Sequence, residues 1–242
     1  MNGLIRNTAR LFQNGGKLFI LAMDHAQSGL MEGLTDVKAT MRMHADSALD
    51  GFLVNVEPAH AMAEDALIHK KLLLRSSFGG SRLSGAFSTI HRNHVSPQTA
   101  LSLGADAVVM MVTFGENDAE GIQHAAADID AYHQLGIPVI TEILAVDFPK
   151  TQTYEVQANG ARACAELGAD VVKAFYTDRF DNIIANCPVP VILAGGPKEK
   201  DICEVAQAAV GDGARGFAFG RNLFQSEDAA ARIRRLDAIL RA

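Results

Sequence analysis

Short, almost entirely apolar segments alternate with helical patterns along nearly the whole chain. Eight of them are predicted to be β-strands, because they are rich in Val, Ile, Leu, Phe and Met and lack the in–out alternation of a half-exposed sheet. Strands of this kind are buried on both faces, which favours a parallel sheet covered by helices. The eight segments are residues 17–24, 51–56, 71–77, 105–114, 138–144, 170–176, 190–195 and 215–220.

The spacing of these segments predicts how the sheet is arranged. Eight strand–helix units in 242 residues give about 30 residues each, the size of one βαβ step. SLGADAVVM (102–110), ELGADVVKAF (166–175) and GDGARGFAFG (211–220) share the same order of helix end, glycine and strand. We therefore predict an α/β fold with one (β/α)8 barrel domain over residues 1–242. A doubly wound open sheet is the alternative, but no GxGxxG follows the first strand.

The composition disfavours several kinds of partner. The formal net charge is −6 and the basic residues are scattered, which argues against nucleic acid or an anionic membrane surface. Three cysteines, Cys164, Cys187 and Cys203, lack metal-ligand spacing and are typical of reduced thiols in a cytosolic protein. No signal-peptide core or membrane-length apolar run is present. We expect a cytoplasmic protein without a metal or cofactor.

A lysine interrupts one of the apolar strands. Lys173 lies in GADVVKAFY (168–176), beside Val171, Val172 and Phe175. In a barrel both faces of a strand are covered, so Lys173 is expected to be buried, which is rare for lysine. Burial disfavours the ammonium form, and a neutral amine can attack a carbonyl carbon to form a Schiff base. The alternative is a structural ion pair inside the barrel.

Other candidate site residues follow strands, where a barrel places its catalytic groups. Asp24 and His25 end the first strand, although an aspartate here could also be a turn cap. The glycine-rich turns AGGPK (194–198) and FGRN (219–222) follow the last two strands. Their backbone N–H groups, with Arg221, favour a bound phosphate, whereas ordinary tight turns are the alternative.

The longest irregular segment is 78–96, which a barrel would place on its catalytic face as a lid or substrate loop. It contains HRNH at 91–94, a histidine spacing that can suit a metal. No third ligand accompanies it, so substrate contact or solvent exposure is favoured instead.

The motifs LAMDHAQSG, GIPVI, ELGADVVKAFY, CPVPVILAGGPK and GARGFAFGRNLFQS resemble those of the class I, Schiff-base aldolases. This family includes archaeal-type fructose-bisphosphate aldolase and deoxyribose-phosphate aldolase, and residues 166–226 are most similar to its members that degrade a phosphorylated quorum-sensing signal by thiolysis. The resemblance implies a (β/α)8 barrel, a Schiff base on Lys173 and an active-site role for Asp24. It also implies phosphate binding by Gly195, Gly196, Gly220 and Arg221, and assembly into a homo-oligomer.

The fifth predicted strand departs from the family pattern. It reads PVITEIL, and Leu144 stands about where the fructose-bisphosphate aldolases have an acid/base tyrosine. Glu142 could replace that tyrosine, or it could be a structural partner of Lys173. Tyr176 is a further candidate and Tyr154 a weaker one.

We therefore predict a metal-independent class I aldolase acting on a small phosphorylated sugar or ketone, with Lys173, Asp24, Glu142 and His25 as catalytic candidates. A transferase that uses the same imine for thiolysis is the second hypothesis. A third is a phosphosugar isomerase or binding protein in which Lys173 forms only an ion pair.

Overall fold

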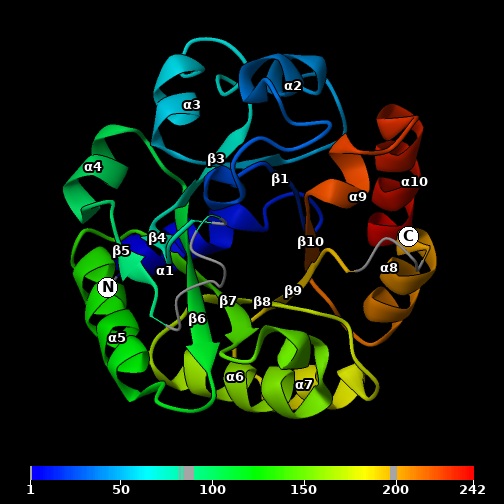
Figure 1. Ribbon diagram of the computed structural model, residues 1–242. Helices are drawn as coiled ribbons and strands as arrows, with labels where there is room; N and C mark the ends of the chain where they lie inside the picture. Colours follow the sequence, from blue (N-terminus) through cyan, green and yellow to red (C-terminus); the bar gives the residue numbers. More distant parts are fainter. Residues whose placement is uncertain (1, 82, 84–89, 197–200) are drawn as a thin grey trace.

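The computed structural model describes residues 2–81, 83, 90–196 and 201–242. Within them, eight parallel strands form a closed barrel, and Figure 1 shows the helices arranged around it. The strands follow one another in chain order, and the last pairs with the first. They are β1 (Leu18–Ala22), β2 (Gly51–Val54), β3 (Lys71–Arg75), β6 (Ala107–Phe114), β7 (Val139–Ala145), β8 (Val171–Ala174), β9 (Val191–Ala194) and β10 (Gly216–Phe219). The predicted strands and the (β/α)8 fold are confirmed.

The helices form the outer layer, and polar side chains fix where several of them begin. Asp36, Ser96 and Thr153 each accept a hydrogen bond from a backbone N–H in the first turn of the helix that follows. The helices are α1 (Asn2–Leu11), α2 (Val37–Met43), α3 (Val56–Ala61), α4 (Pro97–Ser102), α5 (Ala119–Gln134), α6 (Tyr154–Glu166), α7 (Phe180–Asn186), α8 (Ile202–Gly211), α9 (Arg221–Phe224) and α10 (Ala229–Arg241), with short 3-10 helices η1 (Ala26–Ser28) and η3 (Phe148–Gln152).

The segment predicted as an irregular loop contains a small antiparallel sheet. β4 (Ser77–Phe78) pairs with β5 (Arg92–Asn93), directly after β3. The hydroxyl of Tyr132 on α5 donates a hydrogen bond to Asn93 Oδ1 at 3.1 Å, which ties the hairpin to the outer layer. Residues 82 and 84–89 lie outside the described part of the chain, so the lid or substrate role of this segment stays a prediction.

The barrel interior is apolar below and charged above. Residues two apart on a strand share a face, so every second residue of each strand points inward. The lower inward positions form an apolar cluster, closed at the bottom by Leu11 and Phe12 at the end of α1. The next inward positions on three strands are Arg75, Glu142 and Lys173, each two residues beyond a member of this cluster. The charged layer thus lies at the carboxyl ends of the strands.

Two glycines show how closely the strands approach. Gly216 begins β10 and is paired with Leu18, and a Cβ atom at Gly216 would lie 2.2 Å from the Leu18 carbonyl oxygen. By contrast, a Cβ atom at Gly211, at the end of α8, would have no other atom within 4 Å.

We expect G216A to lower the free energy of unfolding by about 1–3 kcal/mol, because the strand backbones must separate to admit the methyl group. The matched control G211A should leave it unchanged or raise it slightly, since alanine is the better helix former. Urea denaturation measures both, and equal free energies for the two variants would contradict this account of the barrel.

Candidate active site

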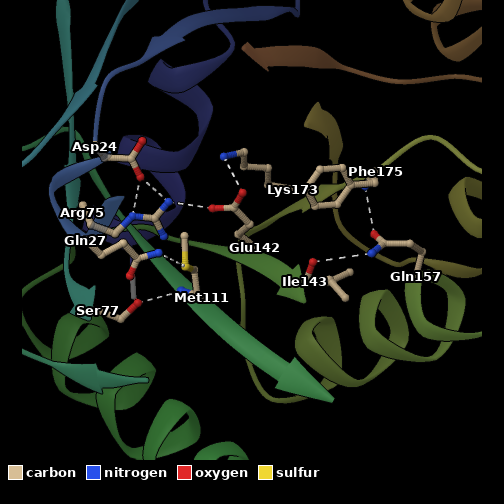
Figure 2. Close-up of polar contacts among 10 residues, drawn as sticks. All are labelled: Asp24, Gln27, Arg75, Ser77, Met111, Glu142, Ile143, Gln157, Lys173 and Phe175. Atoms are coloured by element: carbon tan, nitrogen blue, oxygen red, sulfur yellow. Dashed lines mark hydrogen bonds and ion pairs between the residues drawn. The ribbon is translucent and has the colours of Figure 1, made fainter. Parts of the chain in front are cut away.

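Lys173 points into the barrel from β8 and is only 5% exposed. Its Nζ lies 2.8 Å from Oε1 of Glu142 (Figure 2). The register of the sheet produces this contact, because Glu142 and Lys173 are paired residues on the neighbouring strands β7 and β8. Burial of the lysine is confirmed, and so is its proximity to Glu142, which both interpretations of Glu142 require.

Arg75 joins this pair to Asp24. Its Nε donates to Oδ2 of Asp24 at 2.5 Å, and its Nη2 donates to Oε2 of Glu142 at 2.6 Å (Figure 2). Arg75 is 2% exposed, so two carboxylates and two cations form one buried network. The sequence analysis did not single out Arg75. The signal was nevertheless the one that identified Lys173, namely a charged residue within an apolar strand.

The network keeps both carboxyl groups ionised. Burial raises the pKa of Glu142, but the positive charges of Lys173 and Arg75 outweigh burial and lower this pKa to about 2. The pKa of Asp24 is also lowered, because the same two cations outweigh the effect of its burial. At neutral pH both groups are carboxylates that can accept a proton.

A cavity of about 110 Å³ adjoins the network. Its lining includes the four predicted catalytic residues, Asp24, His25, Glu142 and Lys173, together with three predicted phosphate-binding residues, Gly195, Gly220 and Arg221. The turns after β9 and β10 therefore face the same space as the lysine. Gly196 is next to this lining rather than in it, and Pro197 and Lys198, the end of the predicted turn, lie outside the described residues.

Glycine is needed at both turns because other groups approach closely. A Cβ atom at Gly195 would lie 2.6 Å from Asn222 Oδ1. At Gly220 it would lie 2.8 Å from the Ala22 carbonyl oxygen. A side chain at Gly220 would force the backbone at the end of β1 to shift, whereas at Gly195 the nearest atom ends the Asn222 side chain and moves more easily.

His25 is half-buried and makes an edge-on contact with Phe224, with ring centroids 5.3 Å apart. Burial lowers its pKa and outweighs the opposing charge of Asp24, so the imidazole is neutral at physiological pH. Its Nδ1 has no hydrogen-bond partner in the described structure. A bound molecule could therefore use this atom.

The alternative proton-transfer residues lie elsewhere. The hydroxyl of Tyr154 donates to Asn182 Oδ1 at 2.5 Å, and the ring of Tyr176 packs against Phe180 with centroids 5.2 Å apart. Neither tyrosine is in the lining of the cavity, and nor is Leu144, which is buried in β7. Glu142 is thus the candidate that the structure brings to Lys173.

His91 is buried, so solvent exposure is wrong for this residue, and substrate contact stays a prediction. It is 6% exposed, and burial together with the nearby charge of Arg75 lowers its pKa to about 4. Both ring nitrogens lack partners within the described chain. Across the same residues, no group of three His, Cys, Asp or Glu side chains is arranged to hold a metal ion.

Gln157 is a second residue that the sequence analysis missed. This fully buried side chain of α6 donates to the Thr151 carbonyl at 2.5 Å. It also accepts from the Phe175 backbone N–H at 2.9 Å and donates to the Ile143 carbonyl at 3.5 Å (Figure 2). It ties the loop after β7 to the end of β8, close to Lys173. A glutamine in an amphipathic helix gives no sign of such contacts before the packing is known.

Comparison with known proteins identifies relatives over nearly the full length. A family described as DeoC/LacD family aldolase matches residues 18–226. The 3-hydroxy-5-phosphonooxypentane-2,4-dione thiolase of Salmonella paratyphi A is 32% identical over 98% of this chain and 82% of its own. The 2-amino-3,7-dideoxy-D-threo-hept-6-ulosonate synthase 1 of Archaeoglobus fulgidus is 32% identical over 94% of this chain and 86% of its own.

Solved structures are also similar to this chain over nearly its full length. An archaeal fructose-1,6-bisphosphate aldolase superposes with a TM-score of 0.83 and 26% identity, covering 98% of this chain and 99% of the other. Another such structure, at 25% identity, has its catalytic lysine covalently bound to the carbinolamine intermediate of the substrate, and it matches 99% of this chain and 100% of the other. The predicted resemblance is confirmed. Across the described residues, no helix is both long and apolar enough to cross a membrane.

The lowered pKa of Glu142 makes a prediction about acid stability. Between about pH 4.5 and pH 2 the unfolded chain takes up a proton that the folded Glu142 does not, so the free energy of unfolding falls as the pH falls. In E142Q this contribution is absent. The slope of the free energy of unfolding against pH should therefore decrease by up to about 1.4 kcal/mol per pH unit.

The measurement is urea denaturation of wild type and E142Q at several acidic pH values. E120Q is the matched control, because it removes an exposed carboxylate that pairs with Arg92 at the surface. Parallel slopes for wild type and E142Q would show that the network does not hold Glu142 ionised.

Proposed function

Since the chain belongs to the DeoC/LacD aldolase family, we propose that it makes or breaks a carbon–carbon bond in a small phosphorylated ketose or keto compound through a Schiff base on Lys173. One observation supports this most: Lys173 is buried at the wall of a cavity that Gly195, Gly220 and Arg221 also line. A lysine in a purely structural ion pair needs no such cavity.

In the cleavage direction, the neutral amine of Lys173 attacks the keto carbon of the substrate, and water leaves to form the imine. A base then removes the proton of the hydroxyl group on the far carbon of the bond to be broken, the β-carbon relative to the imine. The carbon–carbon bond breaks, its electron pair flows into the protonated imine, and an aldehyde is released. The enamine takes up a proton, and water hydrolyses the resulting imine to free Lys173.

We assign the proton transfer to Glu142. It is ionised at neutral pH, lies 2.8 Å from the lysine nitrogen and lines the cavity. Asp24 contacts Arg75 rather than Lys173, which favours a positioning role for it. The neutral His25 would contact substrate from the wall of the cavity.

The phosphate of the substrate would bind at the turns after β9 and β10. Gly195 and Gly220 line the cavity and Gly196 follows directly, so their backbone N–H groups would bind the phosphate, and Arg221 would add a charge-assisted hydrogen bond. Phosphate sites at this position recur in (β/α)8 barrels. The proposed enzyme is an aldehyde-lyase that needs no metal ion, because the protonated imine itself accepts the electron pair.

A second candidate is transfer of the cleaved fragment to a thiol. The similarity to a thiolase over 98% of this chain favours it as much as the similarity to a synthase favours the lyase. Product analysis distinguishes the two reactions. A thioester that forms only when a thiol acceptor is added would identify the transferase, whereas a free aldehyde without acceptor would identify the lyase.

We expect borohydride to trap a reduced adduct on Lys173 when the protein is mixed with dihydroxyacetone phosphate and related keto phosphates. K173M should form no adduct and should lose activity by roughly a thousandfold or more, as removal of a covalent nucleophile usually does. Intact and peptide mass spectrometry locates the adduct.

K150M is the matched control, since Lys150 is an exposed lysine in the loop after β7. It should be trapped as the wild type is. Binding of keto phosphates without any adduct on Lys173 would overturn the Schiff-base mechanism and favour the phosphosugar isomerase or binding protein.

R221M tests the phosphate site separately. Loss of one charge-assisted hydrogen bond should raise KM for a phosphorylated substrate by about 10- to 100-fold, with a small change in kcat, because the bond is made equally in ground and transition states. Steady-state kinetics with phosphorylated and unphosphorylated ketones measures this. R234M, which changes an exposed arginine of α10, is the control. An equal KM change for both kinds of ketone would rule out a phosphate contact by Arg221.

A further inference from the structure

We propose that Arg75 is a positioning residue that enables Lys173 to lose its proton, because its permanent positive charge balances the two carboxylates that would otherwise hold Lys173 as an ammonium ion. This inference rests on the proposed role of Lys173 as the nucleophile. It assigns a function to a side chain that touches neither the lysine nor the proposed phosphate site.

The geometry gives Arg75 access to both carboxylates. It donates to Asp24 through Nε and to Glu142 through Nη2, while Lys173 contacts the other oxygen of Glu142. Glu142 is therefore shared, with one oxygen on each cation (Figure 2). Arg75 competes with Lys173 for this charge and also repels the ammonium group, since the two cations lie on opposite sides of one carboxylate.

Only one of the two cations can give up a proton under physiological conditions. A guanidinium group stays protonated, whereas a lysine in a low-dielectric site can become neutral. With Arg75 present, deprotonation of Lys173 leaves two carboxylates and one cation. Without Arg75 it would leave two carboxylates and no cation in a buried space, which is far more costly.

The remaining charged or titratable groups around Lys173 do not replace Arg75. His25, from the end of β1, is neutral because burial lowers its pKa, and His91 is neutral because burial and the nearby charge of Arg75 lower its pKa. Arg221 lines the cavity from the start of α9. A substrate phosphate on Arg221 would cancel its charge, so Arg75 would be the cation left to act on Lys173 during the reaction.

Arg75 also fits this task better than a lysine would. Its planar fork reaches two carboxylates at once, which a single ammonium group cannot do with fixed geometry. Its third nitrogen, Nη1, is buried and has no partner in the described structure. Two donors are thus used to hold the carboxylates in place, and the charge remains close to Lys173.

The test measures the pKa of Lys173 without any substrate. Trace labelling with acetic anhydride from about pH 6 to about pH 11, followed by peptide mass spectrometry, reports the fraction of neutral amine across the ordinary lysine range. We expect R75M to raise this pKa by about one unit or more, which means about tenfold less neutral amine at pH 7.

Two further variants test the charge balance. D24N removes a negative charge and should lower the pKa of Lys173, and this result does not depend on R75M folding well. The double variant R75M/D24N restores the balance and should return the pKa close to that of the wild type. R92M is the matched control, because Arg92 is an exposed arginine of the neighbouring hairpin, and it should change nothing.

An unchanged pKa in R75M or in D24N would overturn the inference, and so would a double variant that keeps the full shift of R75M. Borohydride trapping with dihydroxyacetone phosphate, repeated across pH, separates this failure from that of the proposed function. If wild-type Lys173 forms no adduct at any pH, the Schiff-base mechanism fails. If the wild type is trapped and R75M has the same pH profile, only the role of Arg75 fails.

Discussion

Four charged side chains meet inside an apolar barrel, and the site depends on their staying paired. Asp24, Arg75, Glu142 and Lys173 come from four different strands or strand ends, and each contact joins opposite charges. An isolated charge in such a place would cost several kcal/mol even after local relaxation. The barrel must therefore close in the register that pairs Glu142 with Lys173, because a shift of β8 by one residue would turn Lys173 toward the helices and leave Glu142 without it.

The surroundings of the network explain why it can do chemistry. Apolar layers below it and α1 at the bottom keep water out of the lower barrel. The cavity above it is small and is lined by groups that suit a phosphorylated ketone: a lysine, two carboxylates and glycine turns beside an arginine. Low dielectric strengthens each electrostatic interaction in this space, so the contacts of Arg75 with the two carboxylates carry more energy here than they would at the surface.

Relatives of equal similarity carry the names of a thiolase and a synthase, so family membership leaves the choice of reaction open. The residues of this chain restrict which group can transfer the proton. Leu144 offers no proton where a tyrosine was expected, and the other tyrosines considered lie away from the cavity. Glu142 is left as the proposed proton-transfer group, and it is a carboxylate held by two cations rather than a phenol. A different acid/base group implies different demands on the substrate at the end away from the phosphate.

The sequence alone determined the barrel, because buried parallel strands leave nearly all-apolar segments whose spacing is visible without any structure. It also predicted that Lys173 is buried, because both faces of such a strand are covered. Arg75 is also a charged residue in an apolar strand, but an arginine stays protonated and does not suggest a nucleophile as a lysine does. Only the tertiary structure decided which charges are partners, that His91 is buried, and that Gln157 links two loops. Those facts depend on strand register and on contacts between residues far apart in the chain, which local patterns do not contain.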